Sequence, residues 1–124
     1  MSSLISETAV GAVAAIESLA LPATDSPAHP GTGEIELVAV LQALSDPVRL
    51  LIVVALGDGR ERSCKSIALP VVKSTCTHHF RVLRDAGVIR QRLEGTSRLN
   101  SLRRADLEDR FPGLLDAVLG ALKS

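Results

Sequence analysis

The chain has 124 residues, a formal net charge of zero and a hydrophobic fraction of 46%, which together predict one folded domain with a possible appendage. It contains no Trp or Tyr and only two Phe, so the core is expected to be aliphatic. No run of about 18 uncharged apolar residues is present, which argues against a membrane-spanning helix, and two cysteines are too few for a disulfide scaffold and fit a reducing cytoplasm.

The N-terminal quarter of the chain is expected to lie apart from the folded domain. Residues 4–20 are rich in Ala and Val and predict a moderately amphipathic helix. Residues 21–33 contain three prolines and two glycines and are typical of a flexible linker. We therefore expect two parts, with residues 1–33 forming an N-terminal helix plus linker and residues 34–124 forming the folded domain.

Two helices are predicted at the start of this domain. The first covers residues 34–44 and carries apolar side chains at helical spacing. The second begins at Asp46-Pro47, because Asp caps free amides and Pro at the first helical position loses no hydrogen bond. This second helix, residues 47–56, is apolar nearly all round, so we expect it to be buried.

A helix-turn-helix is predicted next. A short helix over residues 64–69 is stopped by Pro70, and a second helix over residues 74–85 ends before Gly87. Two helices separated by a tight turn, the second of them polar and basic, are typical of this motif.

The second helix of the pair has two different faces. Cys76, Phe80 and Leu83 recur at helical spacing and are expected to face the core. Hydroxyl, imidazole and guanidinium groups cover the opposite face, and such groups bond to phosphate oxygens and base edges when a helix lies in a major groove. We therefore predict a DNA-recognition helix; an ordinary surface helix that lacks acids is the alternative. The residues of this face are Ser74, His78 and Arg81, flanked by Thr75 and Thr77.

A β-hairpin and a final helix complete the predicted fold. Strands over residues 88–93 and 98–102 are joined by a turn at 94–96, and in a winged helix such a hairpin is the wing. The last helix covers residues 105–122 and is interrupted at Pro112-Gly113. The wing arginines that are placed to touch the DNA backbone or minor groove are Arg90, Arg92 and Arg98.

Charge is distributed unevenly along the chain. Residues 1–59 hold one base and seven acids, a net charge of −6, whereas residues 73–104 hold eight bases and two acids, a net charge of +6. A basic stripe on a neutral protein is typical of a phosphate-binding face. A merely solvated face would normally mix both signs.

Three motifs follow one another in register over about residues 40–102: LQALSDPVRLLIVVAL, STCTHHFRVLRDAGVI and the beginning of a short wing, RLEGT. They resemble the ArsR family of bacterial winged-helix repressors. The resemblance implies a mainly α winged helix-turn-helix with a small β-hairpin wing, and a homodimer built on the first and last helices. It also implies two recognition helices one DNA turn apart on a pseudo-palindromic operator.

The resemblance further implies roles for individual residues. The family's pattern assigns base reading to Ser74, Thr75, Thr77 and His78, phosphate contacts to Lys73 and Arg81, and a wing contact to Arg98. With the other arginines of the basic stripe, the candidate DNA-binding residues are Lys73, Ser74, Thr75, Thr77, His78, Arg81, Arg84, Arg90, Arg92 and Arg98.

No metal or other cofactor is predicted. Many family members sense metals through two cysteines at the start of the first helix of the motif, but residues 61–66 hold a single cysteine. Others use Asp and His on the C-terminal helix, which has acids here but no histidine. Cys76, His78 and His79 do not make a site, because Cys76 is expected to face the core with His78 roughly opposite.

Cys64 is a candidate thiol sensor. It is predicted to lie near a helix N-terminus beside Arg62 and Lys65, and such surroundings favour the reactive thiolate, which could respond to oxidants or persulfides. The alternative is a helix-start residue with no role.

We therefore expect a cytoplasmic, homodimeric winged helix-turn-helix regulator that binds double-stranded DNA, most simply a repressor that occupies its operator. No glycine-rich phosphate loop or Cys–His–Asp pattern is present, so an enzyme is not expected. A winged-helix module that binds a protein partner is the alternative from another class. An activator and a thiol-responsive regulator are also left open, as is the effector.

Overall fold

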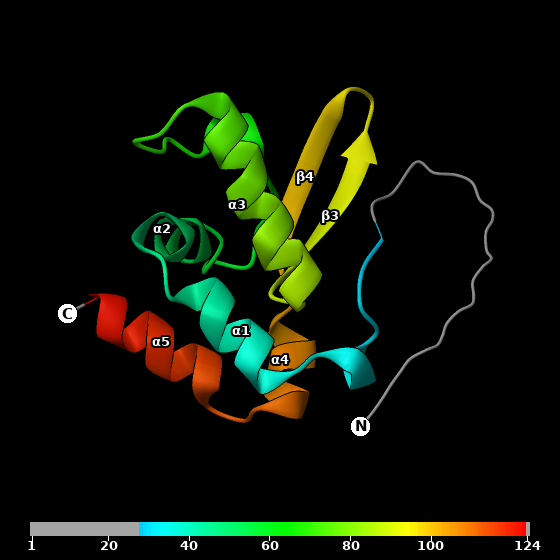
Figure 1. The fold of residues 1–124 in the computed structure, drawn as a ribbon, viewed down its shortest axis with the longest axis vertical. Helices are drawn as coiled ribbons and strands as arrows, with labels where there is room; N and C mark the ends of the chain where they lie inside the picture. Colours follow the sequence, from blue (N-terminus) through cyan, green and yellow to red (C-terminus); the bar gives the residue numbers. More distant parts are fainter. Residues whose placement is uncertain (1–27, 124) are drawn as a thin grey trace.

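The computed structural model describes residues 28–123 (Figure 1). Helices and a β-hairpin follow one another along this part of the chain, which confirms a mainly α fold with a small wing, whereas the predicted helix over residues 4–20 lies outside the described residues. The helices are α1 (Leu37–Leu44), α2 (Pro47–Ala55), α3 (Lys73–Ala86), α4 (Arg104–Arg110) and α5 (Leu114–Lys123). The strands are β2 (Arg62–Ser63), β3 (Ile89–Glu94) and β4 (Ser97–Leu102), and the 3-10 turns are η2 (Thr32–Glu34) and η3 (Cys64–Ser66).

The first two helices begin at different kinds of cap. α1 begins at Leu37, three residues later than predicted, because η2 comes before it and the N-cap Glu36 has an extended backbone. α2 begins where the sequence predicts. The Asp46 carboxylate accepts hydrogen bonds from the amides of Val48 at 2.8 Å and Arg49 at 3.1 Å.

The core is aliphatic, as predicted, and Phe80 is its largest fully buried side chain. Ile52 and Val53 anchor α2 in this core. The prediction that α2 is buried all round is wrong, because Leu51 and Val54 are 48% and 41% exposed. One face of α2 packs on the neighbouring helices, and no described residue covers the other.

The first helix of the helix-turn-helix is shorter than predicted. Only the turn η3 forms within residues 64–69, with the Ser63 hydroxyl accepting a hydrogen bond from the amide of Ser66 at 3.2 Å. The backbone is already extended at Ile67. Pro70 disfavours a longer helix here, because it has no amide to donate to the carbonyl of Ser66 four residues earlier and its ring would clash with that carbonyl.

α3 ends at Gly87, as predicted. Gly87 has a left-handed backbone with φ 89°, and a Cβ at this position would lie 2.6 Å from Cγ1 of Ile35. Glycine is therefore required for both conformation and space. The amides of Gly87 and Val88 close the helix on the carbonyls of Arg84 and Leu83.

The wing is an antiparallel hairpin that packs beside α3. Gln91 on β3 is opposite Asn100 on β4, and Glu94 is opposite Ser97 across a turn in which Gly95 has φ 62°. β2 pairs with the other side of β4, so the strand order is β2-β4-β3 and β3 lies at an edge. Each strand begins or ends one residue away from its predicted bounds.

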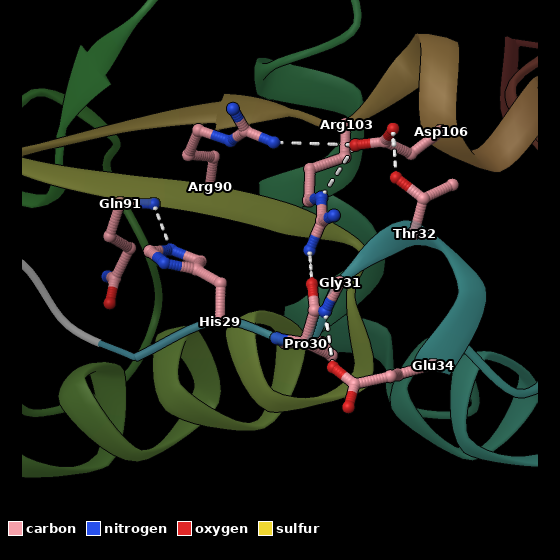
Figure 2. Close-up of polar contacts among 9 residues, drawn as sticks. All are labelled: His29, Pro30, Gly31, Thr32, Glu34, Arg90, Gln91, Arg103 and Asp106. Atoms are coloured by element: carbon pink, nitrogen blue, oxygen red, sulfur yellow. Dashed lines mark hydrogen bonds and ion pairs between the residues drawn. The ribbon is translucent and has the colours of Figure 1, made fainter.

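Residues His29–Glu34, which we call the strap, contact the wing and the segment that follows it (Figure 2). Nε2 of His29 accepts a hydrogen bond from the backbone amide of Gln91 at 2.9 Å. The carbonyl of Pro30 accepts one from the buried guanidinium of Arg103 at 2.7 Å. The strap includes the last five residues of the predicted linker, whereas the domain boundary at residue 34 stays a prediction.

Asp106 is the second point at which the strap is held. Its carboxylate accepts a hydrogen bond from the Thr32 hydroxyl at 2.7 Å and binds Arg103 at 2.9 Å, with Arg90 at 3.4 Å on its exposed side (Figure 2). The hydrogen bonds from Thr32 and Arg103 hold the pKa of Asp106 below its ordinary value.

The last helical segment is broken at Pro112-Gly113, as predicted, with φ 84° at Gly113. α4 and α5 therefore lie at an angle on the side of the domain where α1 also lies (Figure 1). Within residues 28–123 no single helix is long and apolar enough to cross a membrane, and only α1 and α2 together, bent by 99°, have the required length and composition.

Candidate nucleic-acid interface

The polar face predicted for α3 is open to solvent. Ser74, Thr77, His78 and Arg81 are exposed, and Thr75 is half-buried. The Thr77 hydroxyl donates to a carbonyl one turn earlier in the same helix, at 3.2 Å, which leaves the oxygen able to accept a hydrogen bond. The helix therefore presents hydroxyls, an imidazole and a guanidinium on one accessible surface.

The buried face of α3 differs from the prediction at two positions. Phe80 and Leu83 are buried as expected, but Cys76 is half-buried and His79, at 7% exposure, is in the buried set. Arg49 of α2 donates a hydrogen bond to Nδ1 of His79 at 3.1 Å, so this imidazole fastens α3 to α2. The burial of His79 was not predictable from the sequence, because it follows His78 on a helix with many polar residues.

A cleft of about 510 Å³ separates α3 from the wing. Figure 1 shows the two elements side by side along most of the length of α3. Among residues 28–123, no acidic residue lines the cleft and five cationic residues do: Lys65, Lys73, Arg81, Arg84 and Arg98. Thr77, Thr96 and Ser97 add hydroxyls to the same lining. Such a lining attracts a polyanion.

Four of these five cations are free to bind a polyanion. Lys73, Arg81 and Arg98 make no side-chain hydrogen bond or ion pair within residues 28–123, and their side chains come from both walls of the cleft. Lys65 is free in the same sense and was not among the predicted residues. It lies on the segment predicted as the first helix, where the sequence gives no reason to single it out.

Two predicted wing arginines are already engaged. Arg92 binds both carboxylate oxygens of Glu61 at 2.7 Å and Glu94 at 3.0 Å. These hydrogen bonds raise the pKa of Arg92 and, from the other side, lower that of Glu61. Arg90 is paired with Asp106. The acid that pairs with Arg92 lies 31 residues away in sequence, so no local pattern points to it.

Arg84 points inward from the cleft and joins a buried polar chain. It donates to Oε1 of Gln91 at 3.3 Å, and Gln91 donates to Oδ1 of Asn100 at 2.7 Å. Asn100 in turn donates to the carbonyl of Arg62 and, at 3.4 Å, to Sγ of Cys64. α3 is thus linked to all three strands.

Known proteins are similar to this chain in sequence and fold, although no protein-family model matches it. YceK, an uncharacterised helix-turn-helix transcriptional regulator of Bacillus subtilis strain 168, is 34% identical over 82 residues, which are 64% of this chain and 82% of that protein. An ArsR-like transcriptional regulator from Rhodococcus sp. RHA1 is 27% identical, with a TM-score of 0.51 over 70% of this chain and 89% of the other. The chain belongs to the ArsR family of winged helix-turn-helix transcriptional regulators.

A further solved structure is similar to this ArsR-family regulator. The transcriptional repressor BigR from Xylella fastidiosa is 25% identical, with a TM-score of 0.55 over 68% of this chain and 84% of that one.

The other candidate sites of the ArsR-family regulator are its possible metal ligands and its two cysteines. Within residues 28–123 no group of three His, Cys, Asp or Glu side chains could hold a metal ion. Cys64 is half-buried, lines the cleft, and sits in a single 3-10 turn rather than at the start of a longer helix. Cys76 lies elsewhere, with Sγ 3.8 Å from the carbonyl of Val71.

Proposed function

We propose that this regulator is a homodimeric, sequence-specific repressor that binds a pseudo-palindromic operator in double-stranded DNA. The cleft between α3 and the wing carries the proposal, because its five cations face no acid in the lining. Phosphate contacts supply most of the affinity of proteins for DNA, and base contacts supply the specificity.

Each wall of the cleft has its own part. α3 lies in the major groove, where Ser74, Thr75, Thr77 and His78 meet base edges. Lys73 and Arg81 bind the phosphates beside it. The wing contributes Arg98, which is free, whereas Arg84, Arg90 and Arg92 are held within the protein and bind phosphate only if they exchange partners.

Dimerisation is supported by an apolar surface away from the cleft. Leu37, Val38 and Leu41 of α1 are 44%, 66% and 47% exposed, and Leu122 of α5 is 38% exposed. α1 and α5 lie on the same side of the domain (Figure 1). A second copy would cover these side chains and give the two-fold symmetry that a pseudo-palindrome matches. Repression is the proposed outcome because a similar structure, BigR, is a transcriptional repressor.

Fluorescence anisotropy across a salt series tests this function. The probes are duplex DNA from the upstream region of the protein's own gene and a scrambled duplex of the same length. We expect about 10³-fold tighter binding to the upstream duplex and a steep loss of affinity with salt. Arg81→Ala should reduce the salt slope by about one unit, whereas Arg60→Ala, which removes an exposed arginine outside the cleft, should leave it unchanged.

Two other results would redirect the proposal. Equal, weak binding to both duplexes would leave only a non-specific basic surface. No binding at low salt would favour a winged-helix module that binds a protein partner. In that case the native protein and Arg81→Ala should capture the partner equally well in a pull-down.

A thiol-responsive form of the same regulator is favoured by one observation, the hydrogen bond from buried Asn100 to Sγ of Cys64. Oxidation of this sulfur would disturb the polar chain that reaches the wing. The test compares DNA affinity with and without diamide for the native protein and for Cys64→Ser. Equal responses of the two proteins would exclude Cys64 as the sensor.

A further inference from the structure

The N-terminus of α3 carries a side chain that the helix itself does not use. Val72 is the N-cap residue, with extended backbone at φ −71° and ψ 161°, and it makes no side-chain capping hydrogen bond. Its carbonyl accepts the first helical hydrogen bond, from the amide of Cys76 at 3.0 Å. Valine is among the least favourable residues at an N-cap, where Ser, Thr, Asp and Asn can bind the free amides. Helix stability therefore gives no reason for valine at this position.

Packing gives no reason either. Val72 is 69% exposed, the highest value among the large hydrophobic side chains of the described residues. The other exposed side chains of this kind lie on α1, α2, β3 and α5. Figure 1 shows the N-terminus of α3 at the opposite end of the domain from α1 and α5, so the surface proposed for dimerisation does not explain Val72.

The surroundings of Val72 are those of the proposed DNA surface. Lys73 and Ser74 follow it and are exposed, and Lys73 and Thr77 line the cationic cleft. The first residues of a recognition helix are the ones that meet base edges in the major groove. Val72 has two methyl groups and no polar side-chain atom, so it cannot bind a phosphate or a base donor or acceptor. The matching apolar group in the major groove is the 5-methyl group of thymine.

We propose that Val72 packs against the 5-methyl group of a thymine in each operator half-site and so selects thymine at that position. This inference rests on the proposed function, because it requires α3 to enter the major groove. In the complex with DNA, the exposed Val72 side chain would become buried. Residues that are unfavourable for local structure are expected at functional surfaces, and Val72 fits that expectation. The group recognised is a methyl group and not a hydrogen-bonding edge, so it can be removed from the DNA without changing any hydrogen-bonding group.

The experiment begins with duplexes that the protein itself selects from a random pool, and anisotropy then measures their affinities. Each thymine of the enriched motif is replaced in turn by deoxyuridine, which keeps every hydrogen-bonding group and lacks only the 5-methyl. We expect one such replacement per half-site to weaken binding of the native protein about fourfold, the effect of one buried methyl group. With Val72→Ser the same replacement should have no effect, because the partner of the methyl group is gone.

Two controls distinguish a loss of base recognition from a loss of protein stability. Val72→Ser should melt no lower than the native protein, because serine is the better N-cap. Val54→Ser removes an exposed valine from α2 and should keep the full response to deoxyuridine. A double-mutant cycle that combines Val72→Ser with the deoxyuridine replacement separates the energy of this contact from any general loss of affinity.

The outcomes distinguish this inference from the proposed function. A selection that enriches no motif overturns the proposed function and the inference with it. An enriched motif whose deoxyuridine responses are the same in Val72→Ser and in the native protein overturns the inference alone.

Discussion

Gln91 and Asn100 are hydrogen-bonded to each other inside the wing, with Nε2 of Gln91 donating to Oδ1 of Asn100 at 2.7 Å. They are opposite each other on β3 and β4, and only 2% and 0% of their surfaces are exposed. A buried amide without a partner costs more than a hydrogen bond contributes. The pair therefore makes the wing dependent on both side chains.

Asn100→Ala should lower the free energy of unfolding by about 1–3 kcal/mol, because it leaves the Gln91 amide without its acceptor. Urea denaturation measures the change. Ser101→Ala, at the next position of β4, is the control and should stay within about 0.5 kcal/mol. A change at Asn100 no larger than that of the control would show that the pair does not stabilise the wing.

Gly87→Ala should destabilise the protein by about 2–4 kcal/mol, from a left-handed alanine and a methyl group pressed against Ile35. Gly33→Ala is the matched control, because no atom lies within 4 Å of the added Cβ there. Thermal and urea unfolding of both variants provide the comparison. Equal stabilities for the two would contradict the close approach of Ile35.

Asp106→Asn should lower the free energy of unfolding by about 1–2 kcal/mol at pH 7, because the Thr32 hydroxyl and the Arg103 guanidinium lose a charged acceptor. The pKa of Asp106 is lower in the folded protein than its ordinary value. Its contribution is therefore full at neutral pH and is lost as the pH falls through the folded pKa, below about pH 4.

The stability difference between the native protein and Asp106→Asn should accordingly narrow in acid. Urea denaturation from pH 7 to pH 3 measures this difference. Asp109→Asn, on the same helix and with no bonded partner among the described residues, should show no comparable effect. A difference that stays constant down to pH 3 would rule out Asp106 as the titrating group.

Glu61→Gln should make Arg92 more available to phosphate, since it removes the charge of an acceptor that holds the guanidinium through two hydrogen bonds and leaves Glu94 as the remaining carboxylate partner. We expect tighter DNA binding at low salt and a salt slope steeper by about one unit. Asp109→Asn changes the charge equally at a site away from the cleft and should leave the slope unchanged. A slope that stays the same in Glu61→Gln would mean that Arg92 does not reach the DNA.

Local signals in the sequence predicted much of this fold. Asp46-Pro47 begins α2 and Gly87 ends α3, while Pro112-Gly113 separates α4 from α5. Each signal acts through the backbone of its own residues and needs no distant partner. The polar face of α3 was predictable in the same way, from helical spacing alone.

Features that depend on tertiary contacts were not predictable. His79 is buried because Arg49 of α2 reaches it, and Arg92 is engaged because Glu61 lies beside it in space. Residues 29–33 read as a linker by composition, yet they contact the wing and Asp106. In each case the partner is at least 30 residues away, beyond any local pattern.

The His29 imidazole has a consequence for how copies of this protein meet. An edge strand with unpaired amides is a template on which a strand from another chain can add, and this leads to aggregation. β3 is such an edge, and the strap occupies the amide of Gln91 at its centre. A strand could therefore add at this position of β3 only if His29 first released the Gln91 amide.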